Sequence, residues 1–286
     1  MTIETTNRPL TLFAPAKLNL TLDVLFRRPD GYHELDMLNI RIDLCDELEF
    51  TLARDTLITY DGMPAPENDI VQKSIRLYAQ RTGVEINARV HVRKRIPSEA
   101  GLGGGSADGA AVLMALESIY GALGQSALEE VALRVGADVP YCLYNAPCRV
   151  RGVGERIEPV PMPQTALWFV LLKPAGGIST AALFSGLSFP VYHPPTEEAI
   201  HALSHADAAV LGPLLINALQ DPAQSLLPEI ASLVERLKTA GALGASMTGS
   251  GSAVFGLFSS ETAAREAANR FADIPFVCVC RSLPQK

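Results

Sequence analysis

The feature that most constrains the fold of this chain is a glycine-rich segment between a strand pattern and a helix pattern. Four of the five residues from 101 to 105 are glycine. Apolar residues alternate before it over residues 89–96, and a helical apolar stripe follows over residues 107–120, with Ser106 placed to cap that helix. A loop entering a helix offers free N–H groups and the positive end of the helix dipole. The segment therefore predicts a phosphate site, the alternative being a flexible connection.

Two common nucleotide-binding motifs do not fit this segment. No lysine follows the final glycine, as a Walker A loop requires, and Ser106 stands where the dinucleotide-binding motif has its last glycine. In the preceding strand pattern Val90, Val92 and Ile96 face inward, and Lys94 falls in the same register. A charged residue in an apolar row indicates a specific role.

The N-terminal region predicts a long strand. Apolar residues hold the even positions from Leu10 to Val24, which indicates one buried face, and Pro15 is expected to break or bulge the strand. The odd positions from 17 to 23 are polar and project together from the other face. A turn follows at residues 27–31, and a helix is predicted over residues 69–80.

Composition narrows the function classes. The net charge of −7 argues against a general nucleic-acid or anionic-membrane binder, because those partners require a broad basic surface. Five cysteines without CxxC spacing suggest neither a disulfide framework nor a zinc site, and no stretch of about 18 apolar residues occurs. The first nine residues lack the apolar core of a secretory signal. We therefore expect a cytoplasmic protein.

The chain is long enough for two domains. Prolines at 159, 161 and 163 read as a linker, so we predict domains at residues 1–158 and 159–286. The second half predicts helices over residues 197–205, 229–239 and 261–271, with strands near residues 167–172, 245, 254 and 276.

The glycine-rich segment resembles the phosphate loop of the superfamily that includes galactokinase, homoserine kinase, mevalonate kinase and phosphomevalonate kinase. Further motifs are similar to the 4-diphosphocytidyl-2-C-methyl-D-erythritol kinase family within it. These motifs are Pro15-Ala-Lys-Leu-Asn-Leu20, Arg28-Pro-Asp-Gly-Tyr-His-Glu-Leu35, Gly136-Ala-Asp-Val-Pro140, Gly152-Val-Gly-Glu155, Gly177-Ile-Ser-Thr180 and Met247-Thr-Gly-Ser-Gly251. The resemblance spans nearly the whole chain.

The resemblance implies an α+β, two-domain small-molecule kinase fold: an N-terminal ATP-binding domain, a C-terminal α+β domain and an active site in the interdomain cleft. It implies transfer of the ATP γ-phosphoryl group to the 2-hydroxyl of 4-diphosphocytidyl-2-C-methyl-D-erythritol, a step of non-mevalonate isoprenoid biosynthesis. The implied cofactors are ATP and Mg²⁺, whose ligands stay unassigned. The implied partner is a small molecule with a cytidine diphosphate group. We expect no nucleic-acid or membrane partner, and a monomer or weak homodimer.

The resemblance also carries roles onto matching positions. Lys17 and Asp138 are the implied catalytic residues, a cation that stabilises developing charge and a carboxylate that accepts the hydroxyl proton. The implied substrate-binding residues are Asn19, Tyr32, His33 and Thr180, with the Tyr-His pair holding the cytosine. The implied ATP-binding residues are Asn68, Lys94, Pro97, Ser98, Glu99, Ala100, Gly101, Leu102, Gly103, Gly104, Gly105, Ser106 and Ala107.

Pattern alone leaves other interpretations open. Lys17 has the alternative of a solvated lysine on an exposed sheet face, and Asp138 that of a helix cap. Tyr32 and His33 have that of a hairpin tip with a locally packed ring. The rival functions are another kinase of the superfamily, acting on mevalonate or homoserine, and a non-catalytic nucleotide-binding module.

The chain departs from the family pattern in one segment. Asn217-Ala-Leu-Gln220 stands where members commonly have Asn-Asp-Leu-Glu. The two missing acids put any role of that segment in doubt.

Overall fold

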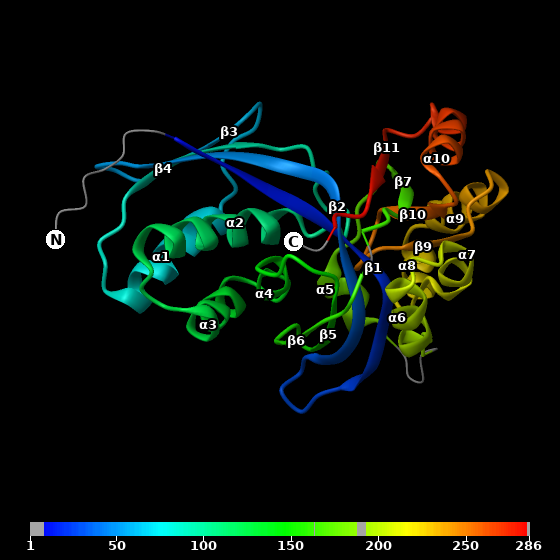
Figure 1. The fold of residues 1–286 in the computed structure, drawn as a ribbon, viewed down its shortest axis with the longest axis horizontal. Coiled ribbons are helices and arrows are strands. Elements are labelled where there is room, and N and C mark those ends of the chain that lie inside the picture. The colour runs from blue at the N-terminus through cyan, green and yellow to red at the C-terminus, as the bar shows by residue number, and fades with distance from the viewer. Residues whose placement is uncertain (1–8, 163, 188–192, 285–286) are drawn as a thin grey trace. The chain divides into compact units, whose positions relative to one another are not determined.

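The computed structural model describes residues 9–162, 164–187 and 193–284, which form two compact units (Figure 1). The first unit consists of residues 9–16, 44–96 and 103–143, and the second of residues 17–43, 97–102 and the described residues from 144 onward. The predicted domain boundary between residues 158 and 159 stays a prediction. Of the three linker prolines, Pro159 ends a strand and Pro163 lies outside the described residues.

Four strands contribute to the first unit, and the first two continue into the second. They are β1 (Leu10–Arg27), β2 (His33–Leu52), β3 (Leu57–Tyr60) and β4 (Ala88–Arg93). β2 pairs antiparallel with β4 from Glu47 opposite Arg93 to Leu52 opposite Ala88, and β3 pairs parallel with β4. The predicted alternation in β4 is confirmed, because Val90 and Val92 are buried and Arg89 is exposed.

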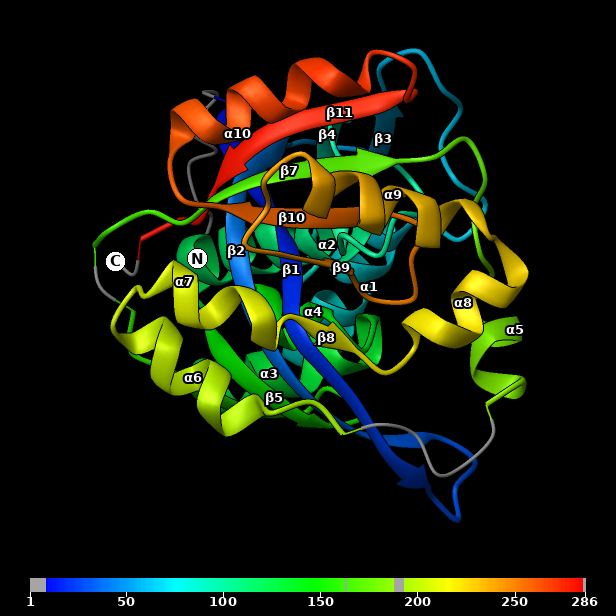
Figure 2. The same ribbon diagram turned by 90° about the vertical axis from the view of Figure 1, so that its right-hand side faces the viewer.

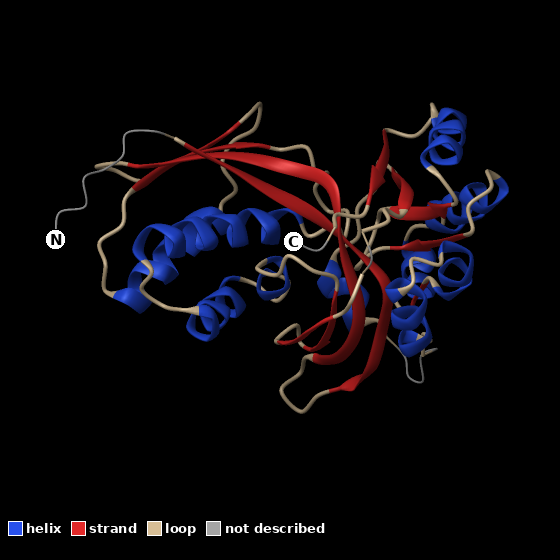
Figure 3. Cartoon of the chain, viewed as in Figure 1, coloured by secondary structure: helices blue, strands red, loops and turns tan. Residues whose placement is uncertain are grey.

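The helices of the first unit lie together on one side of its strands (Figure 3). They are α1 (Ile70–Thr82), α2 (Gly104–Tyr120), α3 (Gln125–Val135) and α4 (Val139–Cys142). Asp69 Oδ1 caps α1 by accepting a 2.7 Å hydrogen bond from the backbone N–H of Gln72. The helix predicted over residues 69–80 is therefore confirmed within two residues.

β1 differs from its prediction in two respects. Both faces are buried from Ala16 to Val24, whereas the alternating pattern predicts only one. The expected break at Pro15 is also wrong, because the strand runs through it. β1 pairs with β2 on one side. On its other side, among the described residues, it pairs with β8, and only at Thr21 and Leu22. Pro15 therefore lies on an open strand edge, where a missing N–H is tolerated.

The second unit contains a four-stranded antiparallel sheet in the order β11-β7-β10-β9. Figure 2 shows α9 and α10 lying over it, where α9 contacts β9 and β10, and α10 contacts β7 and β11. These elements are β7 (Trp168–Lys173), α9 (Glu229–Thr239), β9 (Gly244–Met247), β10 (Val254–Phe258), α10 (Glu261–Ala268) and β11 (Phe276–Arg281). The predicted strands and helices of this region are confirmed.

The remaining elements of the second unit include two strands that extend the sheet of β1 and β2. β5 pairs antiparallel with β2, and β8 pairs parallel with β1. The elements are β5 (Cys148–Gly152), β6 (Arg156–Pro159), α5 (Thr180–Ser185), α6 (Thr196–Ser204), α7 (Ala208–Leu211), η1 (Gly212–Leu214), β8 (Ile216–Asn217), α8 (Gln220–Leu226) and η2 (Asn269–Phe271).

Two further observations concern the cysteines and the length of the helices. The five cysteines all lie in the described part of the chain, and none forms a disulfide. Among the described helices, none combines the length and apolar character needed to cross a bilayer.

Candidate active site

The first half of the glycine-rich loop is fixed to other parts of the second unit by its backbone. Ser252 and Ala253 donate backbone hydrogen bonds of 3.2 Å to the carbonyl oxygens of Glu99 and Ala100. The N–H of Lys17 donates to the carbonyl of Leu102 at 3.0 Å. Ala100 and Leu102 are buried. Hydrogen bonds and burial therefore fix the conformation of this part of the loop, and the alternative of a flexible connection is wrong.

The second half of the loop begins α2 in the first unit. Gly103 is the N-cap in a left-handed conformation, and the helix starts at Gly104. The helix start expected at residue 107, with Ser106 as its cap, is thus wrong, because Ser106 lies inside the first turn. No acidic side chain occupies that turn, so its N–H groups and the helix dipole favour an anion.

Lys17 and Asn19 lie on β1 in a buried polar network. Lys17 is 4% exposed, so the alternative of a solvated lysine is wrong. Its Nζ donates a 2.6 Å hydrogen bond to Asn19 Oδ1, which also accepts from the backbone N–H of Gly249 at 2.8 Å. The hydroxyl of Thr248 accepts from the N–H of Asn19 at 3.1 Å. The odd face of β1 is thus a row of polar residues that is hydrogen-bonded to residues 248–251, which we call the glycine turn.

The same row continues with partners far along the chain. Thr21 and Thr196 share a 3.0 Å hydrogen bond, and Asp23 contacts His193 Nδ1 at 3.0 Å. Burial raises the pKa of Asp23 against the opposing effect of His193. These contacts explain why polar residues on this strand face are buried.

Lys94 lies in the first unit between two buried carboxylates. Its Nζ donates to Asp46 Oδ2 and, at 2.7 Å, to Asp108 Oδ2. Burial alone would lower the pKa of Lys94, but the charges and hydrogen bonds of the two aspartates outweigh it and raise that pKa. This pairing accounts for a lysine in the apolar register of β4.

The two aspartates have unequal surroundings. Asp46 Oδ1 accepts hydrogen bonds from the backbone N–H groups of Arg95 and Ile96, at 2.6 and 2.8 Å. Burial raises the pKa of Asp108 to about 7, with Lys94 opposing the rise and the charge of Asp46 adding to it. Burial therefore disfavours the charged form of Asp108.

Asp138 and Asn68 also lie in the first unit, at helix starts. Asp138 is the N-cap residue of α4, but its side chain does not form the capping hydrogen bond of that helix. Capping therefore does not account for Asp138. Asn68 is exposed and directly precedes Asp69, the cap of α1. The predicted roles of Asp138 in catalysis and of Asn68 and Lys94 in ATP binding stay predictions.

The predicted substrate residues lie in the second unit. Tyr32 is 66% exposed at the turn between β1 and β2, so its ring is not packed locally. The His33 ring contacts that of Phe184 in α5, with centroids 5.0 Å apart. Burial, followed by the charge of Arg27, lowers the pKa of His33. Thr180 begins α5, and its hydroxyl lies 2.6 Å from that of Ser250 in the glycine turn.

Residues 217–220, the segment that departs from the family pattern, form hydrogen bonds to the glycine turn and to Met247 before it. Asn217 Nδ2 donates to the carbonyl oxygens of Met247 and Gly249 at 2.9 and 2.8 Å. Gln220 Oε1 accepts from the N–H of Met247 at 2.8 Å and from the Ser246 hydroxyl at 3.3 Å. The side chain at position 220 therefore acts through an acceptor oxygen, which an amide also supplies.

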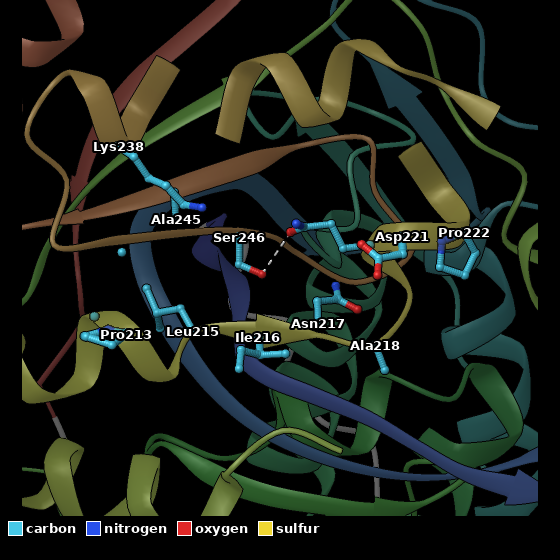
Figure 4. A pocket seen from close by; sticks show the side chains of 13 residues that line it. Pro213, Leu215, Ile216, Asn217, Ala218, Asp221, Pro222, Lys238, Ala245 and Ser246 are labelled. Carbon is cyan, nitrogen blue, oxygen red and sulfur yellow. Dashed lines mark hydrogen bonds between the residues drawn. The ribbon is translucent and has the colours of Figure 1, made fainter. Parts of the chain in front are cut away.

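A pocket of about 510 Å³ opens beside this segment (Figure 4). The residues that line it include Asn217, Asp221, Lys238 and Ser246. The hydrogen bond between Ser246 and Gln220 joins two of its lining residues. None of the predicted catalytic, ATP-binding or substrate-binding residues lines this pocket.

Several residues of these networks have no signal of their own in the sequence pattern, among them Asn39, Phe184, Asp46 and Asp108. Asn39, which accepts from Asn19, and Phe184 lie in segments that carry no chemical motif. Asp46 and Asp108 pair with a lysine 48 and 14 residues away. The signal for this pair is the register of Lys94, because a lysine that is partly removed from water is stabilised by a carboxylate.

Known proteins match both halves of the chain. Residues 69–146 match the model of the GHMP kinases N terminal domain, and residues 198–275 match that of the GHMP kinases C terminal. The 4-diphosphocytidyl-2-C-methyl-D-erythritol kinase of Shouchella clausii (strain KSM-K16) is 40% identical over 256 residues, which cover 87% of this chain and 86% of the relative. The enzyme of that name from Pelotomaculum thermopropionicum (strain DSM 13744 / JCM 10971 / SI) is 40% identical, with 92% and 93% covered.

A solved structure is similar over almost the whole chain. The crystal structure of a 4-(cytidine 5'-diphospho)-2C-methyl-D-erythritol kinase matches with a TM-score of 0.83 and 34% sequence identity. The match covers 96% of this chain and 100% of the solved one.

Proposed function

The chain belongs to the GHMP kinases and, within them, to the 4-diphosphocytidyl-2-C-methyl-D-erythritol kinase family, and from this premise we propose the reaction and the role of each site residue. The reaction transfers the γ-phosphoryl group of ATP to the 2-hydroxyl of 4-diphosphocytidyl-2-C-methyl-D-erythritol, in non-mevalonate isoprenoid biosynthesis. The relatives do not favour the rival mevalonate-type, homoserine-type or non-catalytic interpretations. The observation that carries the chemistry is the buried Lys17, whose backbone bonds the glycine-rich loop and whose ammonium bonds Asn19.

The ATP phosphates bind the glycine-rich loop, residues 97–107, and the first turn of α2. Backbone N–H groups there form hydrogen bonds to phosphate oxygens, and the helix dipole favours their charge. Lys94 and Asn68 complete the ATP-binding set. Mg²⁺ takes most of its ligands from phosphate oxygens and water in such sites, so it enters with ATP. No ligand from the chain is assigned to it.

Lys17 and Asp138 carry the chemistry. The Lys17 ammonium stabilises the negative charge that develops as the phosphoryl group moves. The Asp138 carboxylate orients the acceptor hydroxyl and takes its proton. Most of the acceleration comes from positioning and electrostatics, as is usual for phosphoryl transfer. Support for Lys17 comes from its burial.

The cytidine diphosphate substrate binds through Tyr32, His33, Thr180 and Asn19. The exposed ring of Tyr32 offers a face on which a cytosine stacks, and His33 reads the edge of the base. Phe184 holds the His33 ring through its 5.0 Å contact. Thr180, tied to Ser250, orients the polar part of the substrate. We place the enzyme in the cytoplasm as a monomer or weak homodimer, with no nucleic-acid or membrane partner.

A coupled assay of ADP release tests this proposal. The panel contains 4-diphosphocytidyl-2-C-methyl-D-erythritol, mevalonate and homoserine, and turnover is expected only with the first. Lys17→Met and Asp138→Asn are each expected to lower turnover about a hundredfold or more. The exposed residues Lys238 and Asp55 provide matched controls, Lys238→Met and Asp55→Asn, which keep parental turnover. A folded Lys17 or Asp138 variant within a few-fold of the parent removes that residue from the mechanism.

A further inference from the structure

The oxygen and nitrogen of the Asn19 amide can be told apart by their hydrogen-bond partners. The backbone N–H of Gly249 and the ammonium of Lys17 both donate to one oxygen of Asn19, at 2.8 and 2.6 Å. Neither group accepts a hydrogen bond. The atom they meet is therefore Oδ1, and Nδ2 must lie on the opposite side, so the assignment of this amide follows from its partners.

The orientation of the Asn39 amide, on β2, follows from that of Asn19. Asn19 Nδ2 donates to Asn39 Oδ1 at 2.7 Å, and within the described residues its one further hydrogen-bond contact is the weakly accepting sulfur of Met37 at 3.4 Å. Asn39 is completely buried. Because its oxygen faces Asn19, its Nδ2 faces away, and no acceptor among the described residues pairs with it.

A buried amide with one unpaired donor is a costly choice for a core position. A leucine of similar size would remove this unpaired donor but would leave Asn19 Nδ2 without its acceptor, so packing alone does not explain Asn39. What asparagine supplies there, and leucine does not, is an acceptor for Asn19 Nδ2. Without it, the Asn19 amide loses the contact that keeps Oδ1 directed at Lys17 and Gly249.

We propose that Asn39 is a positioning residue for phosphoryl transfer. Its oxygen holds the Asn19 amide, and Asn19 in turn holds the Lys17 ammonium and the Gly249 N–H of the glycine turn. A displaced ammonium stabilises the developing charge less well, which lowers turnover without weakening the binding of ATP. The inference rests on the proposed role of Lys17.

Two substitutions separate positioning from packing. Asn39→Leu removes the acceptor and is expected to lower kcat about tenfold, with the KM for ATP within about twofold of the parent. Its free energy of unfolding is expected to stay close to that of the parent, because the unpaired Asn39 donor is gone while the buried Asn19 Nδ2 loses its acceptor. Asn39→Asp keeps an oxygen facing Asn19 and is expected to stay within about threefold of parental kcat. Ile40→Val, a buried neighbour without a bond to Asn19, is the packing control and keeps parental kcat.

A double-mutant cycle with Lys17→Met completes the test. If Asn39 acts through Lys17, Asn39→Leu causes no further loss of kcat in the Lys17→Met background. Additive losses overturn the inference, as does parental kcat in the leucine variant or an equally large loss in a folded aspartate variant. If the leucine variant does not fold, the aspartate variant decides alone, because parental kcat supports positioning and a large loss refutes it. Parental turnover of Lys17→Met instead overturns the proposed mechanism, which is a separate outcome.

Discussion

Gly101 packs so closely against Thr248 that a β-carbon on the glycine would overlap the carbonyl oxygen of the threonine. The backbone of Gly101 has a φ of +72°, which side chains rarely adopt. Thr248 has little freedom to move away, because its carbonyl accepts from the N–H of Gly251 at 3.0 Å and its N–H donates to Ala253 at 3.1 Å. The glycine-rich loop and the glycine turn are thus two backbones in direct contact.

This contact predicts that Gly101→Ala raises the KM for ATP by tenfold or more. The methyl group forces the loop away from the turn and out of the conformation that places its N–H groups. Gly121, the C-cap of α2, supplies a matched control, because it has a φ of +57° but open space around its β-position. Gly121→Ala therefore has the conformational cost, about 1 kcal/mol, without the collision. Equal KM values for the two variants would show that the contact does not shape the ATP site.

The Lys94 cluster predicts a pH dependence of stability. The pKa of Asp108 is about 7 in the folded protein, above its ordinary value near 3.8, so the folded state binds this proton more tightly. The resulting stabilisation is complete below about pH 4 and is lost as the pH rises through 7. Asp108→Asn mimics the protonated acid and lacks this dependence. We expect the free energy of unfolding of the parent, relative to this variant, to fall between pH 4 and 7 by a few kcal/mol, on the order given by such a pKa difference.

Urea denaturation of both proteins at several pH values measures this difference. Asp55→Asn is the control, because Asp55 forms an exposed pair with Arg89. Its pH profile is expected to parallel that of the parent. Parallel profiles for Asp108→Asn and the parent would mean that Asp108 is already ionised well below neutral pH.

The sequence predicts those helices, strands and loops whose pattern depends on neighbouring residues. The helix over residues 69–80, the alternation in β4 and the glycine-rich loop each depend on neighbouring residues, and the sequence pattern predicts each of them. The start of α2 was missed, because consecutive glycines indicate a loop by propensity, although Gly103 caps the helix in a left-handed conformation. The passage of β1 through Pro15 depends on which strand edge is open, which the local sequence does not contain.

The site was predictable in its motifs and not in its pairings. The spacing of Lys17 and Asn19 predicts one strand face, yet the burial of that face depends on Asn39, Thr196 and Thr248, which are distant in sequence. The register of Lys94 predicts burial, but its carboxylate partners come from β2 and α2. The spacing of apolar residues along a strand does not indicate which polar residues, distant in sequence, will form hydrogen bonds to it.

The departure at Gln220 predicts little change when the usual acid is restored. Gln220→Glu keeps an oxygen that accepts from the Met247 N–H, so the free energy of unfolding is expected to stay within about 1 kcal/mol of the parent. Gln220→Leu leaves that buried N–H unpaired and is expected to cost about 1–3 kcal/mol. Thermal or urea unfolding measures both. A leucine variant as stable as the parent would show that the acceptor at position 220 does not hold the turn.

The Tyr32 turn predicts a loss confined to one ligand. If Tyr32 stacks on the cytosine, Tyr32→Ala weakens binding of the cytidylyl substrate by about 1–3 kcal/mol, or tenfold to a hundredfold. ATP affinity is expected to change little, because the phosphates are assigned to the glycine-rich loop. Phe13→Ala is the matched control, since Phe13 is another exposed aromatic residue, 62% accessible on β1. Separate calorimetric titrations with ATP and the cytidylyl substrate measure the two affinities.

The exposure of Tyr32 makes this result interpretable. A ring that is 66% exposed leaves no cavity when truncated, so a loss of substrate affinity reports a lost contact with the ligand. Stacking is indifferent to the identity of the base, so cytidine and uridine nucleotides should lose affinity in parallel. Discrimination between them then depends on the His33 edge, and His33→Ala should reduce it. Equal losses for ATP and the cytidylyl substrate would indicate a folding defect, whereas no loss for either would assign Tyr32 to the turn alone.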